Sequence, residues 1–203
     1  KNKAKKNKSK FGVVTFEPHP VSVLRPDIAR RRLAPFRTKI RRLKECGVDL
    51  VYALPFSRQF SQITAESFVR EVLVKGLGVC HVVVGHDYRF GKDRVGDYGL
   101  LAAQGKMLGF GVTEVAGIGE SGQLFSSTRV RNSLESGNLG EASSILGSLW
   151  EVEERVRHGD ARGRELGYPT ANIAFKDHVV PTYGVYAVWC GVKEGGETKW
   201  YPA

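Results

Sequence analysis

The chain has 203 residues, of which 41% are hydrophobic and 26% charged, as in ordinary globular proteins. These proportions exclude a fibrous repeat and a wholly disordered chain, and the length allows one large domain or two small ones. The formal charge of +10 is concentrated at the start, because it falls to +4 without the six lysines between Lys1 and Lys10. We therefore expect residues 1–10 to form a disordered, solvated tail rather than a binding element.

The first half alternates short apolar runs with helix-period segments, which is typical of βαβ units and a parallel sheet. Residues 11–16 and 49–54 each predict a strand. Between them, Phe36, Ile40 and Leu43 recur at helical spacing and predict a helix.

The strongest strand signal is Val82-Val83-Val84, which is β-branched throughout and lacks polar alternation. Such a run predicts a central parallel strand covered by helices on both faces. Thr64 is placed to cap the helix before it. A helix over about 97–108 and a strand near 112–115 complete a doubly wound pattern. Two short helices follow, after Ser127 or Thr128 and after Asn138.

The character of the chain changes near Trp150. Residues 150–158 predict a strand, a glycine-rich loop follows, and residues 179–181 and 185–192 carry aromatic and β-branched side chains. This last third is typical of antiparallel β structure, so we place a domain boundary near Leu149.

The cysteines and apolar segments favour a cytoplasmic protein with no membrane partner. Cys46, Cys80 and Cys190 are an odd number without the spacing of a zinc site or a disulfide framework. No apolar stretch approaches the roughly 20 residues that span a bilayer, and no signal peptide is recognisable. The only methionine is Met107, and the chain stops just after a strand-like stretch, so we expect both ends to be cut.

Ligands of open α/β sheets bind beyond the carboxyl ends of the strands. Three strand exits are unusual in sequence: residues 17–20 (Glu-Pro-His-Pro), 55–58 (Pro-Phe-Ser-Arg) and 85–91 (Gly-His-Asp-Tyr-Arg-Phe-Gly). Prolines stiffen two of these exits, and glycines bracket the third. They are the first places to look for a site.

Residues 126–131, Ser-Ser-Thr-Arg-Val-Arg, open a helix with hydroxyls at its cap and an arginine one turn later. The unpaired backbone N–H groups of such a first turn outline a phosphate site. An ordinary N-cap with solvated arginines explains the same spacing. The residues alone leave both readings open.

Residues 158–172 carry glycines at every fourth place, two arginines between them, and a threonine and an asparagine at the exit. Glycines let the backbone approach a polyphosphate closely, and a threonine hydroxyl can join a Mg²⁺ shell. The segment is not a P-loop, and a mobile hairpin accounts for it equally well. His19, His86 and His158 lie on separate loops without paired metal-ligand spacing, so we expect structural or phosphate-contacting roles.

Four motifs in one order resemble the prokaryotic bifunctional FAD synthetases, which join riboflavin kinase to FMN adenylyltransferase. They are residues 16–20, residues 84–91 with Gly96-Asp97 after them, residues 126–131 and residues 158–172. The resemblance spans residues 11–203. It implies a Rossmann-like α/β nucleotidylyltransferase domain over 11–149 and the N-terminal part of an antiparallel β-barrel riboflavin kinase domain over 150–203.

The resemblance also implies two reactions and the residues that serve them. ATP phosphorylates riboflavin to FMN in the kinase domain, and the FMN phosphate attacks ATP in the transferase to give FAD and pyrophosphate. The transferase would hold ATP phosphates with Ser127, Thr128 and Arg131, and the flavin with Pro18, Pro20, Asp87, Tyr88 and Phe90. The kinase domain would hold ATP with Gly159, Arg162, Gly163, Gly167, Thr170 and Asn172, the last two also binding Mg²⁺.

Two parts of the family pattern lie outside this sequence. A Gly-x-Phe-Asp-Gly-x-His-x-Gly-His signature opens the family's transferase, and nothing of that kind precedes Phe11. The kinase's catalytic glutamate is expected downstream of Pro202. We therefore expect this chain alone to have little or no turnover.

Two alternatives belong to other functional classes. A noncatalytic flavin- or nucleotide-binding module would retain the pocket without the signature histidines. Nucleic-acid binding is suggested by the pI of about 9.6, but the charge lies mostly in the tail, so we expect no nucleic-acid partner. The sequence leaves the oligomeric state open.

Overall fold

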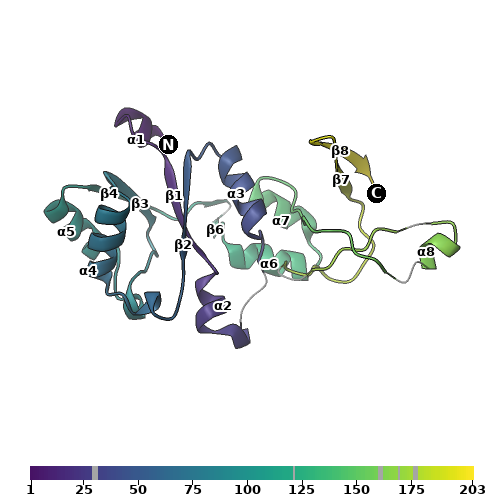
Figure 1. Cartoon of the computed structure of the whole chain (residues 1–203), viewed down its shortest axis with the longest axis horizontal. Helices are drawn as coiled ribbons and strands as arrows, with labels where there is room; N and C mark the ends of the chain where they lie inside the picture. The colour runs from purple at the N-terminus through teal and green to yellow at the C-terminus, as the bar shows by residue number, and fades with distance from the viewer. Residues whose placement is uncertain (29–31, 121, 160–161, 169, 176–177) are drawn as a thin grey trace.

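A computed structural model describes the chain except for residues 29–31, 121, 160–161, 169 and 176–177 (Figure 1). The architecture is α/β, as expected. The two strands β1 (Gly12–Glu17) and β2 (Leu50–Pro55) are parallel, with Gly12 opposite Leu50 and Glu17 opposite Pro55. Both strands lie within one residue of the sequence prediction.

The crossover between β1 and β2 contains α3 (Phe36–Glu45), whose apolar periodicity predicted it. The backbone of Gly47 then takes a positive φ of 75°, a conformation that glycine adopts without strain. The helix carries Thr38 in a buried position. It therefore packs one face toward the molecule and leaves its arginines at the surface.

The second parallel pair consists of β3 (His81–Gly85) and β4 (Gly111–Val115), joined through α5 (Tyr98–Leu108). The Asp97 carboxylate caps α5 by accepting the N–H of Leu100 at 2.9 Å. The helix agrees with the predicted range of about 97–108, and its cap adds a detail that was not predicted.

One expectation about the sheet is wrong. The valine-rich strand was predicted to be central, yet among the described residues β3 pairs only with β4, and β1 pairs only with β2. Val83 is consequently 57% exposed. The uniform apolar run is real, but a strand needs neighbours on both sides to be central, and β3 has one.

The larger core lies between β3 and the helices beside it. The Thr64 hydroxyl caps α4 (Ala65–Ser67), which continues directly as the π-helix η3 (Phe68–Gly76). The wider π turns replace the single α-helix expected there. The buried side chains of this core are Ala65, Phe68, Val69, Leu73, Val84, Phe90, Leu101 and Phe110.

A second core joins the first half of the chain to the last third. Helices α6 (Ser127–Glu135) and α7 (Leu139–Leu146) bury Val130, Leu134 and Ala142 together with Val179. The indole N–H of Trp150 donates to the Leu33 carbonyl at 3.0 Å. Residues on both sides of the expected boundary therefore share one packed cluster.

The last third contains the antiparallel hairpin of β7 (Trp189–Glu194) and β8 (Glu197–Pro202), turned by two glycines of positive φ. This confirms the antiparallel character. Residues 150–158 do not form the expected strand; they make one bridge, between Arg157 and Asn172. The remainder of this segment has no partner strand among the described residues, so it forms no ladder.

The lysine-rich start is also ordered differently from the expected disordered tail. Residues Asn2–Lys6 form the short helix α1, whose Lys3 ammonium lies 3.3 Å from the His81 imidazole at the start of β3. Such contacts with the folded part supply the partners that an isolated turn lacks.

Short elements complete the fold: α2 (Pro20–Leu24), η1 (Pro26–Ile28), η2 (Phe60–Gln62), η4 (Lys92–Arg94), β5 (Gly119–Glu120), β6 (Gln123–Leu124) and α8 (Arg162–Glu165). No helix in the described ranges combines the length and apolar character needed to cross a bilayer.

Candidate functional site

A continuous row of aromatic rings runs across the exits of the first three strands. Phe16 at the end of β1 lies 5.5 Å from Phe56 and 5.7 Å from Phe60, both of which follow β2. The row continues through Phe68 to Phe90, with ring centres 5.6 Å apart in that last step. These separations are those of favourable edge and tilted pairs. Rings from all three predicted exits thus meet in one place.

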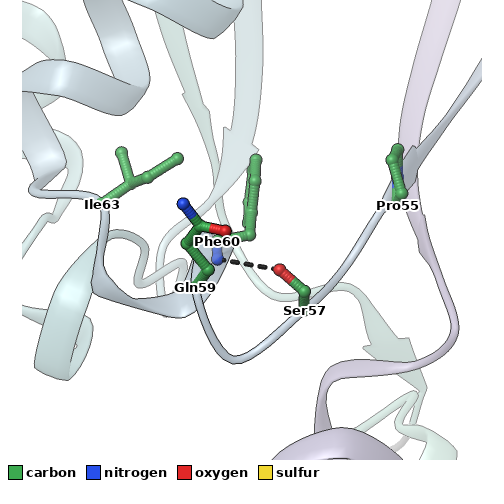
Figure 2. Close-up of a pocket in the computed structure, with 5 residues that line it drawn as sticks. All are labelled: Pro55, Ser57, Gln59, Phe60 and Ile63. Atoms are coloured by element: carbon green, nitrogen blue, oxygen red, sulfur yellow. Dashed lines mark hydrogen bonds between the residues drawn. The ribbon is translucent and has the colours of Figure 1, made fainter.

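The loop after β2 forms an open hollow of about 370 Å³ beside this row (Figure 2). The Ser57 hydroxyl accepts the Phe60 N–H at 3.0 Å and holds the turn. Small-molecule pockets begin at roughly this size. The hollow is lined by Pro55, Ser57, Gln59, Phe60 and Ile63.

The predicted flavin residues of the β3 exit lie at the far end of the row. Tyr88 stacks on Phe90 at 5.5 Å and 19° between planes. Burial raises the pKa of the Tyr88 phenol. Phe90 is only 6% exposed, so it supports the row from the core, while Asp87 stays at the surface.

The predicted flavin residues of the β1 exit bracket His19. Pro18 is exposed, and Pro20 begins α2 with His19 as its N-cap. The His19 Nδ1 atom accepts the Val21 N–H at 3.2 Å. Local capping therefore fixes this imidazole, while the adjoining Phe16 ring belongs to the aromatic row.

Behind the β1 exit, Arg32 makes a two-point contact with Glu17. Its two terminal nitrogens donate to the carboxylate oxygens at 2.9 and 2.8 Å. This contact holds the pKa of Glu17 below its ordinary value of 4.5, through the hydrogen bond first and the charge of the guanidinium as well. A bidentate arginine fixes both the position and the orientation of a carboxylate.

The predicted phosphate residues lie at the start of α6. Ser126 caps the helix by accepting the Arg129 N–H at 3.2 Å, so Ser127 and Thr128 are its first two residues and are exposed. Arg129 donates to Glu141 at 2.8 Å and ties α6 to α7. Arg131 reaches back to the Ser127 carbonyl at 3.1 Å. The structure thus shows the N-cap that both readings share, and the phosphate site stays a prediction.

The predicted kinase loop folds back on its own exit. Arg157 donates its N–H to the Asn172 carbonyl at 2.8 Å, and Tyr168 donates to the Gly163 carbonyl at 2.6 Å. A Cβ atom added at Gly163 would lie 3.3 Å from the Thr170 hydroxyl, and one at Gly159 would meet the Asn172 amide. Both glycines therefore permit a close approach to the two predicted metal ligands.

The two remaining predicted ATP-binding residues of this loop are Gly167 and Arg162. Gly167 takes a φ of 81° after α8, which again suits glycine. Arg162 begins α8, and its side chain lies outside the described part of the structure.

Comparison with known families accounts for both halves of the chain. The family described as FAD synthetase matches residues 1–129, which is more than half of the chain. The chain belongs to the FAD synthetase family. A second family, described as riboflavin kinase, matches residues 146–203.

Curated relatives of this chain are named bifunctional riboflavin kinase/FMN adenylyltransferase. The protein of Escherichia coli K12 is 44% identical over 87% of this chain and 56% of its own length. The proteins of Pseudomonas fluorescens and Listeria monocytogenes are 42% and 40% identical over the same shares. The chain thus spans about half the length of the relatives it matches.

A solved structure has the same fold over nearly the whole of this chain. It is titled a macrolide-efflux protein from Streptococcus pneumoniae and has a TM-score of 0.80 and 32% sequence identity. The match covers 98% of this chain and 64% of the other.

Sequence reasoning missed two features of this candidate site. The loop after β2 was noted for its prolines, but its hollow and its Phe60 and Gln59 were not predicted. The ion pair of Arg32 with Glu17 was missed entirely, since nothing in a single sequence relates residues 15 apart on a loop and a strand. Aromatic residues at three strand exits were a usable signal for the row.

We expect Glu17→Gln to lower the free energy of unfolding by about 1 kcal/mol at neutral pH, because it removes a charge-assisted pair that is partly screened by water. Since the pKa of Glu17 is lowered in the folded state, the pair stabilises the protein above pH 4.5 and loses its effect as pH falls through the folded pKa. Urea unfolding of both proteins at neutral and acid pH measures this. If the difference in unfolding free energy between the two proteins stayed constant with pH, the Glu17 carboxylate would not be the stabilising group.

Proposed function

We propose that the protein to which this chain belongs makes FAD in two steps, phosphorylating riboflavin and then adenylylating FMN. The observation that carries the proposal is the aromatic row, which joins rings near the ends of three strands, together with the hollow of the loop after β2 beside it. A flat tricyclic flavin ring stacks well on aromatic side chains, and the hollow offers an amide and a hydroxyl for its polar edge. The two family matches support the same pair of reactions.

In this proposal, residues 11–149 form a Rossmann-like transferase domain and residues 150–203 the start of a barrel-like kinase domain. The parallel pairs β1–β2 and β3–β4 support the first part, because one further parallel strand between β1 and β3 would join them into a doubly wound sheet. The family's signature strand is the natural occupant. The β7–β8 hairpin supports the second part, since it is antiparallel, as the strands of the family's barrel are expected to be.

Ser127, Thr128 and Arg131 would position the ATP phosphates in the transferase. Neither reaction needs a covalent enzyme intermediate, so alignment and charge neutralisation are the protein's task. The exposed first turn of α6 suits that task because its N–H groups point outward.

Thr170 and Asn172 would hold Mg²⁺ in the kinase domain. Their hydroxyl and amide oxygens are donors that Mg²⁺ accepts, and the adjacent glycines leave room for ATP phosphates. When bound, the ion would neutralise charge on the transferred phosphoryl group.

The intact gene product tests the proposal. Incubated with riboflavin, ATP and Mg²⁺, it should yield FMN and then FAD, separable by chromatography. Formation of neither product would refute the proposal. We expect the 203-residue chain by itself to show little or no turnover, and robust FAD synthesis by it would contradict our account of the missing groups.

The flavin pocket has its own test in Gln59→Glu. This change removes an amide donor and places a carboxylate in the hollow, so flavin affinity should fall about tenfold. Fluorescence titration of the 203-residue chain with riboflavin measures the dissociation constant. Gln62→Glu is the matched control, because Gln62 is exposed three residues later and does not line the hollow. Equal losses in both variants would place the flavin elsewhere.

A noncatalytic flavin-binding module is the second candidate. Such a module would retain the flavin pocket without the chemistry. Sequencing the gene upstream of the Lys1 codon decides the matter: an intact signature there would rule out this reading for the whole protein.

A further inference from the structure

A group of basic side chains gathers behind the β1 exit, and two of its members, Arg32 and Lys39, belong to none of the four motifs. Lys39 projects from α3 and donates to the Thr15 hydroxyl of β1 at 3.2 Å. Arg32 contacts Glu17 two residues further along the same strand. We call His19, Arg32, Lys39 and Arg131 the basic cluster; α3 and α6, which supply two of them, lie on the same side of β1 and β2 (Figure 1).

The positive charge of Lys39 has no close carboxylate partner among the described residues. In the described ranges its ammonium has the Thr15 hydroxyl as its partner and no carboxylate within 4.0 Å. Burial lowers the pKa of Lys39, the charge of Arg32 lowers it further, and Glu17 raises it in part. An ammonium has three donors, and a fixed position with two of them left over suits an anionic ligand.

His19 offers a neutral donor beside this ammonium. Its Nδ1 accepts the Val21 N–H, so in the neutral ring the proton resides on Nε2. Desolvation lowers the pKa of His19, and the charges of Arg32, Lys39 and Arg131 lower it further against the opposing effect of Glu17. The imidazole is therefore neutral near pH 7 and presents Nε2–H as a donor.

The balance of charge in the cluster points to a multiply charged anion. Among the described residues, Glu17 is the acid that acts on both His19 and Lys39, and its carboxylate is already held by Arg32 at both oxygens. Lys39 and the Nε2–H of His19 remain, and the charge of Arg131 on α6 acts on the His19 ring. Phosphate groups satisfy such donors because each brings several acceptor oxygens and more than one negative charge.

We infer that Lys39 and His19 bind a diphosphate group, either the terminal phosphates of ATP or the pyrophosphate released from it. The inference rests on the proposed adenylyl transfer, which produces that group. Lys39 neutralises charge on the diphosphate, and His19 positions it as a neutral donor. Arg32 acts indirectly, by holding Glu17 away from the ligand.

The test is isothermal titration of the 203-residue chain and of Lys39→Gln with inorganic pyrophosphate. Glutamine retains a donor for Thr15 but carries no charge. The variant should bind pyrophosphate about tenfold more weakly, as expected for the loss of one charge-assisted hydrogen bond. Lys44→Gln is the matched control, because Lys44 is exposed on the same helix. It should leave the dissociation constant within about twofold of the unchanged chain.

Further measurements on Lys39→Gln distinguish a role of Lys39 in binding from a role in folding. AMP, which has no diphosphate, should bind Lys39→Gln and the unchanged chain equally, and the unfolding temperature and riboflavin affinity should not change. If Lys39→Gln binds both ATP and pyrophosphate more weakly than the unchanged chain does, the site holds the phosphates of bound ATP. If only its affinity for pyrophosphate falls, the site holds the released product.

Three results would overturn the inference. They are the absence of pyrophosphate binding by the unchanged chain at millimolar concentration, the same loss of affinity for pyrophosphate in Lys39→Gln and Lys44→Gln, and a loss of affinity for AMP in Lys39→Gln as large as its loss for pyrophosphate. Failure of the proposed function looks different, because pyrophosphate binding is measured without flavin. A chain that discriminates the two lysines with pyrophosphate but binds no riboflavin would retain the diphosphate site and lose the flavin pocket.

Discussion

Replacing Gly91 with alanine is expected to lower the free energy of unfolding by about 3 kcal/mol or more, through backbone strain and a steric clash together. Gly91 has a φ of 75°, which L side chains rarely adopt. A Cβ there would lie 2.6 Å from the Ala65 Cα and 2.7 Å from its nitrogen. Those atoms belong to the backbone at the start of α4 and cannot rotate away, so the loop after β3 would have to move.

Gly78→Ala is the control for this prediction. Gly78 also has a positive φ, 59°, but an added Cβ would meet nothing within 4 Å. It should therefore cost about 1 kcal/mol, from strain alone. Urea unfolding of the two variants measures the difference. If both variants lost a similar unfolding free energy, the loop after β3 would adjust its conformation readily. Tyr88 and Phe90 would then not be held in fixed positions for a flavin.

Leu134→Ala is the second large effect, with an expected loss of about 2–5 kcal/mol for a cavity in a packed core. Leu134 has no exposed surface and lies in the cluster that α6 and α7 share with Val179. Its carbonyl also accepts the Thr182 N–H at 3.3 Å. The variant should loosen the junction of the two halves of the chain, because one side chain serves both.

Leu149→Ala provides the comparison, since Leu149 is 64% exposed and its truncation should change stability by no more than about 0.5 kcal/mol. Denaturant unfolding gives both values. If Leu134→Ala behaved like Leu149→Ala, the two halves would not be packed as described, and the α6 start would not be held by this cluster.

Local features of the fold were readable from the sequence. The ends of β1 and β2 and the cap at Thr64 follow from hydrophobic periodicity and from capping chemistry within a few residues. The family likewise follows from motifs, because four short segments in fixed order are specific even when each one alone is weak.

The tertiary structure decided everything that depends on residues far apart in the chain. The aromatic row joins Phe16, Phe56 and Phe90 from three exits, and the partner of Arg32 is fixed only when its loop returns to β1. A valine-rich run indicates a strand but not how many neighbours it has, which is why β3 was wrongly predicted to be central. Periodicity and caps are set by neighbours within a turn or two, whereas pockets, ion pairs and strand order are set by which segments pack together.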